Sequence, residues 1–406
     1  MACVLRPAAC SVSTGDPLTF ERAADRRDAL AAPPETYTRW VRTTLARVAG
    51  EADAGILFDS TISEPTELLA GVVRRAFNGQ VTDRYESVFS AGNRYVARAV
   101  AARYGVAPTQ VIAATGATSA MAMAIRAFVR RGDHVVVESP CFDLLPALAR
   151  EAGAEVSFVS RPPPAFDLDP AALQAALRPN TALVLLTQLH NPSGARLSPD
   201  ALEALATVTR KAGVPLLVDE VYADFAGPEA SAWSGVPGVM VANSLTKVHG
   251  LFALKCGWLV GSPDHVARVE AANPQGDLGV SKLAHAVAAL VLEDLAPFEA
   301  HWRSVLDRSR AVMARHAEAM RRAGLIEGAL PQDGCMFFPR ICGVSDTLAL
   351  AEQLWTQDHL AVAPGEHFGL GGHIRLGFGG DAEALDRGLA RLSAALAARV
   401  PKSAHS

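Results

Sequence analysis

Seven short apolar runs that alternate with helical patterns constrain the fold of this chain more than any other feature of its sequence. The runs are rich in Val, Ile and Leu, and they occupy residues 111–114, 134–138, 156–159, 182–186, 215–218, 239–242 and 258–260. Continuous apolar strands between helices are typical of a mostly parallel sheet that is buried on both faces. We therefore expect an α/β fold built around a mostly parallel seven-stranded sheet that helices cover.

Changes in this pattern divide the 406 residues into three expected parts. Residues 1–57 carry helical stretches and prolines without a strand pattern, which favours an N-terminal arm of helices. Residues 58–285 contain the apolar runs and are expected to form a large α/β domain. Residues 286–406 contain long helical segments and further strand patterns at 335–339 and 373–378, which favour a smaller C-terminal α+β domain.

Charge and cysteine content exclude several classes of protein. The chain has 38 basic and 42 acidic residues spread along its length, so it lacks the basic patch that a nucleic-acid partner requires. Its six cysteines show no CxxC spacing, which favours reduced thiols inside the cell. No uninterrupted apolar run reaches the roughly 18 residues of a membrane-spanning helix. We expect a cytoplasmic protein with small-molecule substrates.

Polar segments follow several of the expected strands, at the edge where open α/β sheets bind ligands. The segment 116–119 (GATS) would open a helix, and its small residues would let main-chain N–H groups approach an anion. Taken alone, such a segment is more often a simple connection between strand and helix. The segment 190–194 (HNPSG) could likewise hold a ligand or form an ordinary Asn-Pro turn.

Two further segments carry ionisable side chains. Asp219 ends a very apolar run, so its carboxylate needs a partner, which could be a basic side chain or a protonated ring nitrogen of a bound heterocycle. Lys247, in the segment 244–247 (SLTK), could be an amine nucleophile with a depressed pKa or a solvated loop lysine.

In this order, the four segments resemble those of the fold type I, pyridoxal 5′-phosphate (PLP)-dependent aminotransferases of class I and II, over roughly residues 58–380. The resemblance implies that Lys247 binds PLP as a Schiff base and then moves a proton as the general base. Asp219 would pair with the ring nitrogen and keep it protonated, and Asn191 and Tyr222 would hydrogen-bond the phenolic oxygen of the ring.

The resemblance also assigns the remaining parts of the site. The expected phosphate ligands are Gly116, Ala117, Thr118, Ser244, Thr246 and Lys255. Phe142 matches the aromatic residue that stacks on the ring, and Arg375 matches the arginine that binds the substrate α-carboxylate beside Asn191. Tyr85 lies where family members reach the phosphate of the neighbouring subunit, so a homodimer with shared active sites is expected. No metal site is expected.

The chain departs from the family pattern at two of these positions. Lys255 replaces an arginine that grips the phosphate, and Phe142 replaces a common tyrosine. A lysine cannot reproduce the bidentate fork of an arginine, so these changes point to a specialised member. His190 and His249 lie beside site residues, and we expect both to be loop histidines with satisfied hydrogen bonds.

Three functions are compatible with these residues. The first is transamination, in which an amino group moves between an amino acid and a 2-oxo acid. The second is another PLP reaction on the same fold, such as β- or γ-elimination or replacement, decarboxylation or an oxidase-like step. The third is a ligand-sensing regulator, which is disfavoured because residues 1–55 show no clear DNA-binding helices and because Lys247, Asp219 and Arg375 are all present.

Overall fold

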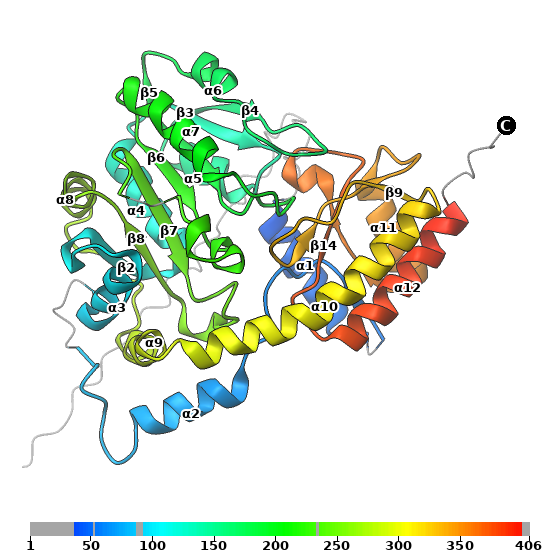
Figure 1. The fold of residues 1–406 in the computed structure, drawn as a ribbon, viewed down its shortest axis with the longest axis horizontal. Coiled ribbons are helices and arrows are strands. Elements are labelled where there is room, and N and C mark those ends of the chain that lie inside the picture. The colour runs from blue at the N-terminus through cyan, green and yellow to red at the C-terminus, as the bar shows by residue number, and fades with distance from the viewer. Residues whose placement is uncertain (1–35, 52, 87–91, 233–234, 400–406) are drawn as a thin grey trace, which may run out of the picture. The chain divides into compact units, whose positions relative to one another are not determined.

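A seven-stranded sheet lies at the centre of the larger part of the structure (Figure 1). In this computed structural model the described residues are 36–51, 53–86, 92–232 and 235–399. Across the sheet, the strands are ordered β2 (Val111–Thr115), β8 (Cys256–Val260), β7 (Val239–Ser244), β6 (Leu216–Asp219), β5 (Thr181–Thr187), β3 (His134–Ser139) and β4 (Glu155–Ser160). Strand β8 runs opposite to the other six strands of this sheet, which share one direction. The predicted mostly parallel sheet is therefore confirmed.

Both faces of this sheet are covered because successive apolar side chains of each strand point to opposite faces. One face packs against helices α4 (Gly116–Phe128), α5 (Leu144–Glu151) and α8 (Pro263–Ala272). The other face packs against α2 (Thr66–Ala76), α3 (Arg94–Tyr104), α6 (Pro170–Ala176), α7 (Pro199–Lys211) and α9 (Lys282–Glu293). The alternation of strand and helix seen in the sequence therefore gives a three-layered arrangement.

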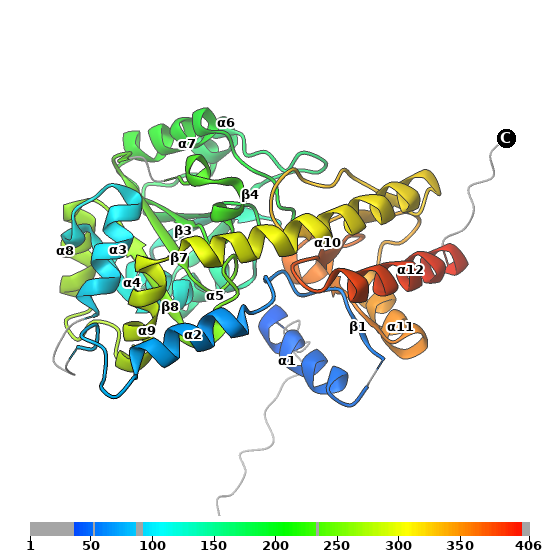
Figure 2. The same cartoon turned by 60° about the horizontal axis from the view of Figure 1, so that its bottom comes forward.

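The C-terminal part is built around a small antiparallel sheet and three helices. Strand β14 (Ile374–Gly377) lies between β10 (Met336–Phe337) and β13 (Ala363–Pro364), and strands β9 (Ile326–Glu327) and β11 (Arg340–Ile341) form a separate pair. The helices are α10 (Ala296–Arg322), α11 (Thr347–Asp358) and α12 (Ala382–Arg399). Figure 2 shows α10 extending from the side of the large sheet to the C-terminal elements.

The segment before the large sheet is bound to the C-terminal part. Helix α1 (Tyr37–Val48) is followed by strand β1 (Gly55–Ile56), which pairs in parallel with β12 (Leu360–Ala361). The sequence showed no strand at this point because a two-residue strand leaves no periodicity to detect. Residues 1–35 of the expected arm lie outside the described residues, and the boundaries of the large and small domains at 57/58 and 285/286 stay predictions.

The described helices give no candidate for a membrane span: none is both long enough and apolar enough.

Strand β14 packs directly on the main chain of the segment that follows β1. A Cβ atom on Gly377 would lie 1.8 Å from the carbonyl oxygen of Asp59 and 2.3 Å from its carbonyl carbon. Both neighbours are main-chain atoms, so no side chain can turn away to make room.

We therefore predict that Gly377→Ala lowers the free energy of unfolding by at least about 1–3 kcal/mol, the usual cost of overpacking. Gly380→Ala is the matched control, because a Cβ atom there meets nothing within 4 Å and its φ is not left-handed. Thermal unfolding of the two variants and the wild type checks the prediction, and equal melting temperatures would contradict it.

Candidate active site

The predicted site residues gather at the carboxyl ends of the parallel strands. Asn191 follows β5, Asp219 is the last residue of β6, and Ser244 is the last residue of β7, with Lys247 in the loop beyond it. Parallel neighbours bring these ends to one edge of the sheet, where open α/β folds bind ligands. The sheet topology therefore brings together the segments that the sequence marked separately.

The carboxylate of Asp219 is buried without a basic partner in hydrogen-bond contact among the described residues. Its side chain is 6% exposed, and Oδ1 accepts a hydrogen bond of 3.1 Å from the main-chain N–H of Val221. Burial raises the pKa of Asp219 to about 7, although the Val221 N–H and the positive charge of Lys247 oppose the rise. A protonated ring nitrogen would supply the missing partner, so this position fits the expected cofactor.

The positive charge of Lys247 lowers the pKa of the Asp219 carboxyl group, which indicates that the two side chains lie near each other. Its Nζ donates a hydrogen bond of 3.1 Å to Oγ1 of Thr61 and lies 5.3 Å from the centre of the Phe252 ring. Lys255 Nζ lies 5.5 Å from the same ring. The two lysines therefore share one aromatic neighbour, and neither Thr61 nor Phe252 was identified from the sequence.

Helix α4 begins at the small residues that were expected to hold a phosphate. Gly116 has a φ of +74°. A Cβ atom on Gly257 of β8 would lie 2.3 Å from the carbonyl carbon of Gly116. The first N–H groups of a helix have no partner within the helix, and those of Ala117 and Thr118 belong to the first turn of α4; their role as phosphate ligands stays a prediction. Asp277 accepts hydrogen bonds of 2.6 Å from the N–H of Thr115 and the hydroxyl of Ser119, two contacts that the sequence did not reveal.

The guanidinium of Arg375 is held in a cage of three segments. Arg375 is 2% exposed, and its Nη1 donates a hydrogen bond of 2.8 Å to Oδ1 of Asn191. Nη2 donates to the carbonyl oxygen of Phe58 at 3.1 Å and to the hydroxyl of Tyr37. Buried Nε has no partner among the described residues. The group is therefore fixed in orientation while one of its N–H donors stays available.

The N-terminal segment also contacts Tyr222 and Phe142, two residues that were predicted to bind the cofactor ring. The hydroxyl groups of Tyr222 and Ser60 lie 2.8 Å apart, and the ring of Phe142 meets that of Tyr37 edge-on with 6.0 Å between ring centres. No motif in the sequence marks Tyr37, Phe58, Ser60 or Thr61 as site residues, because their contacts join positions more than one hundred residues apart.

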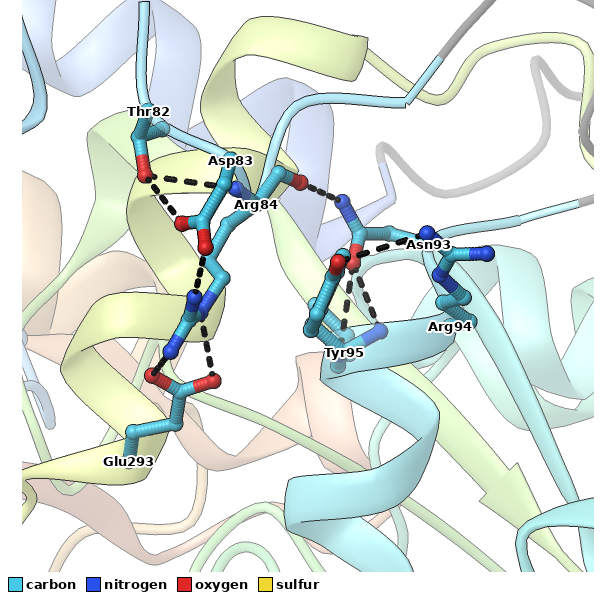
Figure 3. A network of polar contacts seen from close by, with 8 residues as sticks. Thr82, Asp83, Arg84, Asn93, Arg94, Tyr95 and Glu293 are labelled. Carbon is cyan, nitrogen blue, oxygen red and sulfur yellow. Dashed lines mark hydrogen bonds and ion pairs between the residues drawn. The ribbon is translucent and has the colours of Figure 1, made fainter.

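Tyr85 is the predicted site residue that stands apart. Its side chain is 46% exposed, and no hydrogen bond among the described residues joins it to the others. Figure 3 shows how its surroundings are held: Arg84 binds Glu293 through Nε at 2.9 Å and Nη2 at 3.0 Å, and Asn93 Nδ2 donates 2.9 Å to the Arg84 carbonyl oxygen. Its expected contact with a second subunit stays a prediction.

His190 and His249, which lie beside site residues in the sequence, differ in their hydrogen bonding. His190 is buried, with Nδ1 2.6 Å from the Ser193 hydroxyl and Nε2 2.8 Å from the Pro140 carbonyl oxygen, as expected. For His249 the expectation of satisfied hydrogen bonds is wrong: the side chain is 1% exposed, and neither ring nitrogen has a partner among the described residues. Burial lowers its pKa to about 4, so the ring is neutral at physiological pH.

Comparisons with known proteins agree with this geometry. The family model of the class I and II aminotransferases matches residues 74–392. A capreomycidine synthase of Streptomyces vinaceus is 32% identical over 315 residues, which cover 75% of this chain and 79% of the relative. The arginine–pyruvate transaminase AruH of Pseudomonas aeruginosa is 28% identical over 367 residues, 86% of this chain and 91% of the relative.

A solved structure is similar over nearly the whole length. The PLP-dependent cyclase OrfR is 25% identical and has a TM-score of 0.79, with 93% of this chain and 100% of that chain covered. The comparisons confirm the resemblance, the fold and the PLP-dependent enzyme class that the sequence predicted. The chain belongs to the class I and II aminotransferases.

Proposed function

We propose that this enzyme moves the amino group of an amino acid to a 2-oxo acid, with Lys247 as the anchor of PLP and as the proton carrier. The observation that supports this most directly is the buried Asp219 carboxylate, which lacks a basic hydrogen-bond partner among the described residues and lies near the Lys247 amine. Bound PLP would supply an electron sink that stabilises negative charge at the α-carbon of the substrate. The protein supplies positioning and proton transfer.

Around this centre, each residue would hold one part of the cofactor. Asp219 would keep the ring nitrogen protonated, and Asn191 and Tyr222 would hydrogen-bond the phenolic oxygen. Phe142 would stack on the ring. The phosphate would be bound by the residues that surround the start of α4 and the end of β7, namely Gly116, Ala117, Thr118, Ser244, Thr246 and Lys255.

Arg375 would bind the α-carboxylate of the substrate. Its guanidinium is fixed by Asn191 and Phe58, and its Nε is without a partner among the described residues. The Tyr37 hydroxyl lies on the same guanidinium, so it would line the carboxylate site from the side of α1. A planar fork in this position suits a carboxylate better than any other common group.

Asp59 supports a substrate with a cationic side chain. It lies between Phe58, which contacts Arg375, and Ser60, which contacts Tyr222. Burial raises the pKa of Tyr222, and the negative charge of Asp59 adds to that rise, so the carboxylate lies near the site. The side chain is exposed and forms no ion pair among the described residues. The name of the relative AruH also gives arginine as a substrate of that protein.

A second candidate is a PLP reaction that closes a ring. One similar protein is named for such chemistry, since OrfR is a PLP-dependent cyclase, and the relative from Streptomyces vinaceus is named a capreomycidine synthase and not an aminotransferase. Both reactions would use the same anchor, ring partner and carboxylate site. They would differ in the fate of the substrate carbon skeleton, which product analysis distinguishes.

We further propose that the enzyme works in the cytoplasm as a homodimer, in which Tyr85 reaches the phosphate of the neighbouring subunit. The exposed position of Tyr85 beside the Arg84–Glu293 ion pair supports this role.

The first prediction concerns the anchor. In Lys247→Ala, borohydride should no longer fix PLP to the protein, and release of 2-oxo acid from amino acids should be lost, whereas Lys211→Ala, on the end of α7, should behave like the wild type. Mass spectrometry of the reduced protein and oxo-acid assay check this. Persistent labelling of Lys247→Ala would contradict the anchor, and a cyclic wild-type product without oxo acid would favour the second candidate.

The second prediction concerns Asp219 in the cofactor-free protein. Its pKa is raised from 3.8 to about 7, so the folded state binds a proton that the unfolded state has released, and stability is lost as the pH rises from about 4 to about 7. At about pH 8, Asp219→Asn should therefore have a higher melting temperature than the wild type and a free energy of unfolding that is larger by up to about 4 kcal/mol. At about pH 5, the difference in the free energy of unfolding should be smaller. The same variant should bind PLP more weakly. A pH-independent difference in melting temperature would contradict the raised pKa.

The third prediction concerns the substrate side chain. Asp59→Asn should raise the KM for arginine about tenfold, because a charge-assisted hydrogen bond is lost, and leave the KM for alanine within about twofold. Glu67→Gln, an exposed carboxylate on the first turn of α2, is the control. Steady-state kinetics with both amino acids give the two KM values. Equal changes in the KM for arginine and for alanine would exclude a contact between Asp59 and the substrate side chain.

A further inference from the structure

The large sheet contains a fully buried ion pair near the proposed carboxylate site. Arg161 Nη1 and Glu138 Oε2 are 2.7 Å apart, and both side chains are 0% exposed. Glu138 belongs to β3, and Arg161 follows the end of β4, so the pair lies at the same edge of the sheet as the site. Arg161 Nε also donates 2.6 Å to the carbonyl oxygen of Phe166.

The pair is connected to the site through Thr187. The second oxygen of Glu138 accepts hydrogen bonds from the N–H of Thr187 at 2.8 Å and from its hydroxyl at 2.5 Å. Because the single proton of this hydroxyl is directed to Glu138, its oxygen is free to accept, and it does so from the N–H of Asn191 at 3.0 Å. Asn191 in turn accepts from Arg375.

Stability alone is a weak reason for such an arrangement. Burying two charges costs several kcal/mol per ion, and a buried ion pair often adds nothing to the free energy of folding. Both hydrogen bonds from Thr187 end on one oxygen of the Glu138 carboxyl group, whose other oxygen binds Arg161. With its own proton donated to Glu138, the Thr187 hydroxyl can only accept from the Asn191 N–H, and this hydrogen bond holds the main chain that carries the Asn191 side chain.

We propose that Arg161, Glu138 and Thr187 are positioning residues that orient Asn191, and through it the Arg375 guanidinium, for the substrate carboxylate. This inference rests on the role of Arg375 in the proposed function. The chain of hydrogen bonds runs from the interior of the large sheet to a residue of β14, so it links the orientation of the carboxylate site to the rigid part of the fold.

Thr187 is the residue at which this can be tested with least disturbance. Thr187→Val removes the hydroxyl and keeps the shape, and Thr187→Ser keeps the hydroxyl. The probes are N-acetylalanine and N-acetylalaninamide, which cannot react with the cofactor and differ only in the carboxylate. Calorimetry on the holoenzyme gives a dissociation constant for each.

We expect the wild type to bind the acid more tightly than the amide. Thr187→Val should weaken binding of the acid about tenfold and binding of the amide by less than about twofold, whereas Thr187→Ser should restore binding of the acid to within about twofold. In an Arg375→Ala background, Thr187→Val should weaken the acid no further, because the two residues act through one contact.

The outcomes distinguish the positioning role of Thr187 from the carboxylate-binding role of Arg375. Unchanged acid binding in Thr187→Val, or an equal loss with and without Arg375, overturns the positioning role while leaving the carboxylate site of the proposed function intact. If Arg375→Ala itself leaves the preference for the acid unchanged, the proposed carboxylate site is wrong, and the positioning role falls with it. Equal weakening of acid and amide in Thr187→Val would show a general structural effect and also overturns the proposal.

Discussion

The guanidinium of Arg375 joins three stretches of chain that are far apart in the sequence. It lies on β14 of the C-terminal part and contacts Asn191 beyond β5 of the large sheet, Tyr37 at the start of α1, and the main chain at Phe58. A buried cation requires such partners because its desolvation would otherwise cost several kcal/mol. The need to satisfy one charge therefore ties the N-terminal segment, the sheet edge and the small sheet together, and it fixes the geometry on which the proposed site depends.

The sequence predicted the large sheet well because its strands are buried on both faces. Runs such as 182–186 and 239–242 are apolar throughout, and they correspond to β5 and β7 with small differences at the ends. The C-terminal strands were harder to predict. The pattern at 335–339 gives only the two-residue β10, and β1, β9, β11, β12 and β13 are equally short, so tertiary pairing determines them and no local period reveals them.

The same distinction holds for the site. Asp219, Lys247 and Asn191 stand at strand ends in motifs that mark them, and the structure brings their segments to one edge. Tyr37, Thr61 and the Glu138–Arg161 pair carry no motif, and only the folded chain brings them to the site. His249 was misjudged because sequence shows which residues are neighbours in the chain but not whether a buried ring will find a hydrogen-bond partner.

The ring of Phe252 lies within 5.5 Å of Nζ of Lys255 and 5.3 Å of Nζ of Lys247. Each ammonium group therefore lies within the range of a cation–π interaction with the same ring. Lys255 moreover has a φ of +45°, an unusual backbone conformation for a residue with a side chain. A substitution at position 255 alters the surroundings of Lys247 through this ring, and its effect differs according to the residue at 252. Because the three side chains share these contacts, we expect the effects of substitutions at 247, 252 and 255 to be non-additive: an arginine introduced at 255 beside Phe252 meets a different electrostatic setting from one beside a small residue at 252.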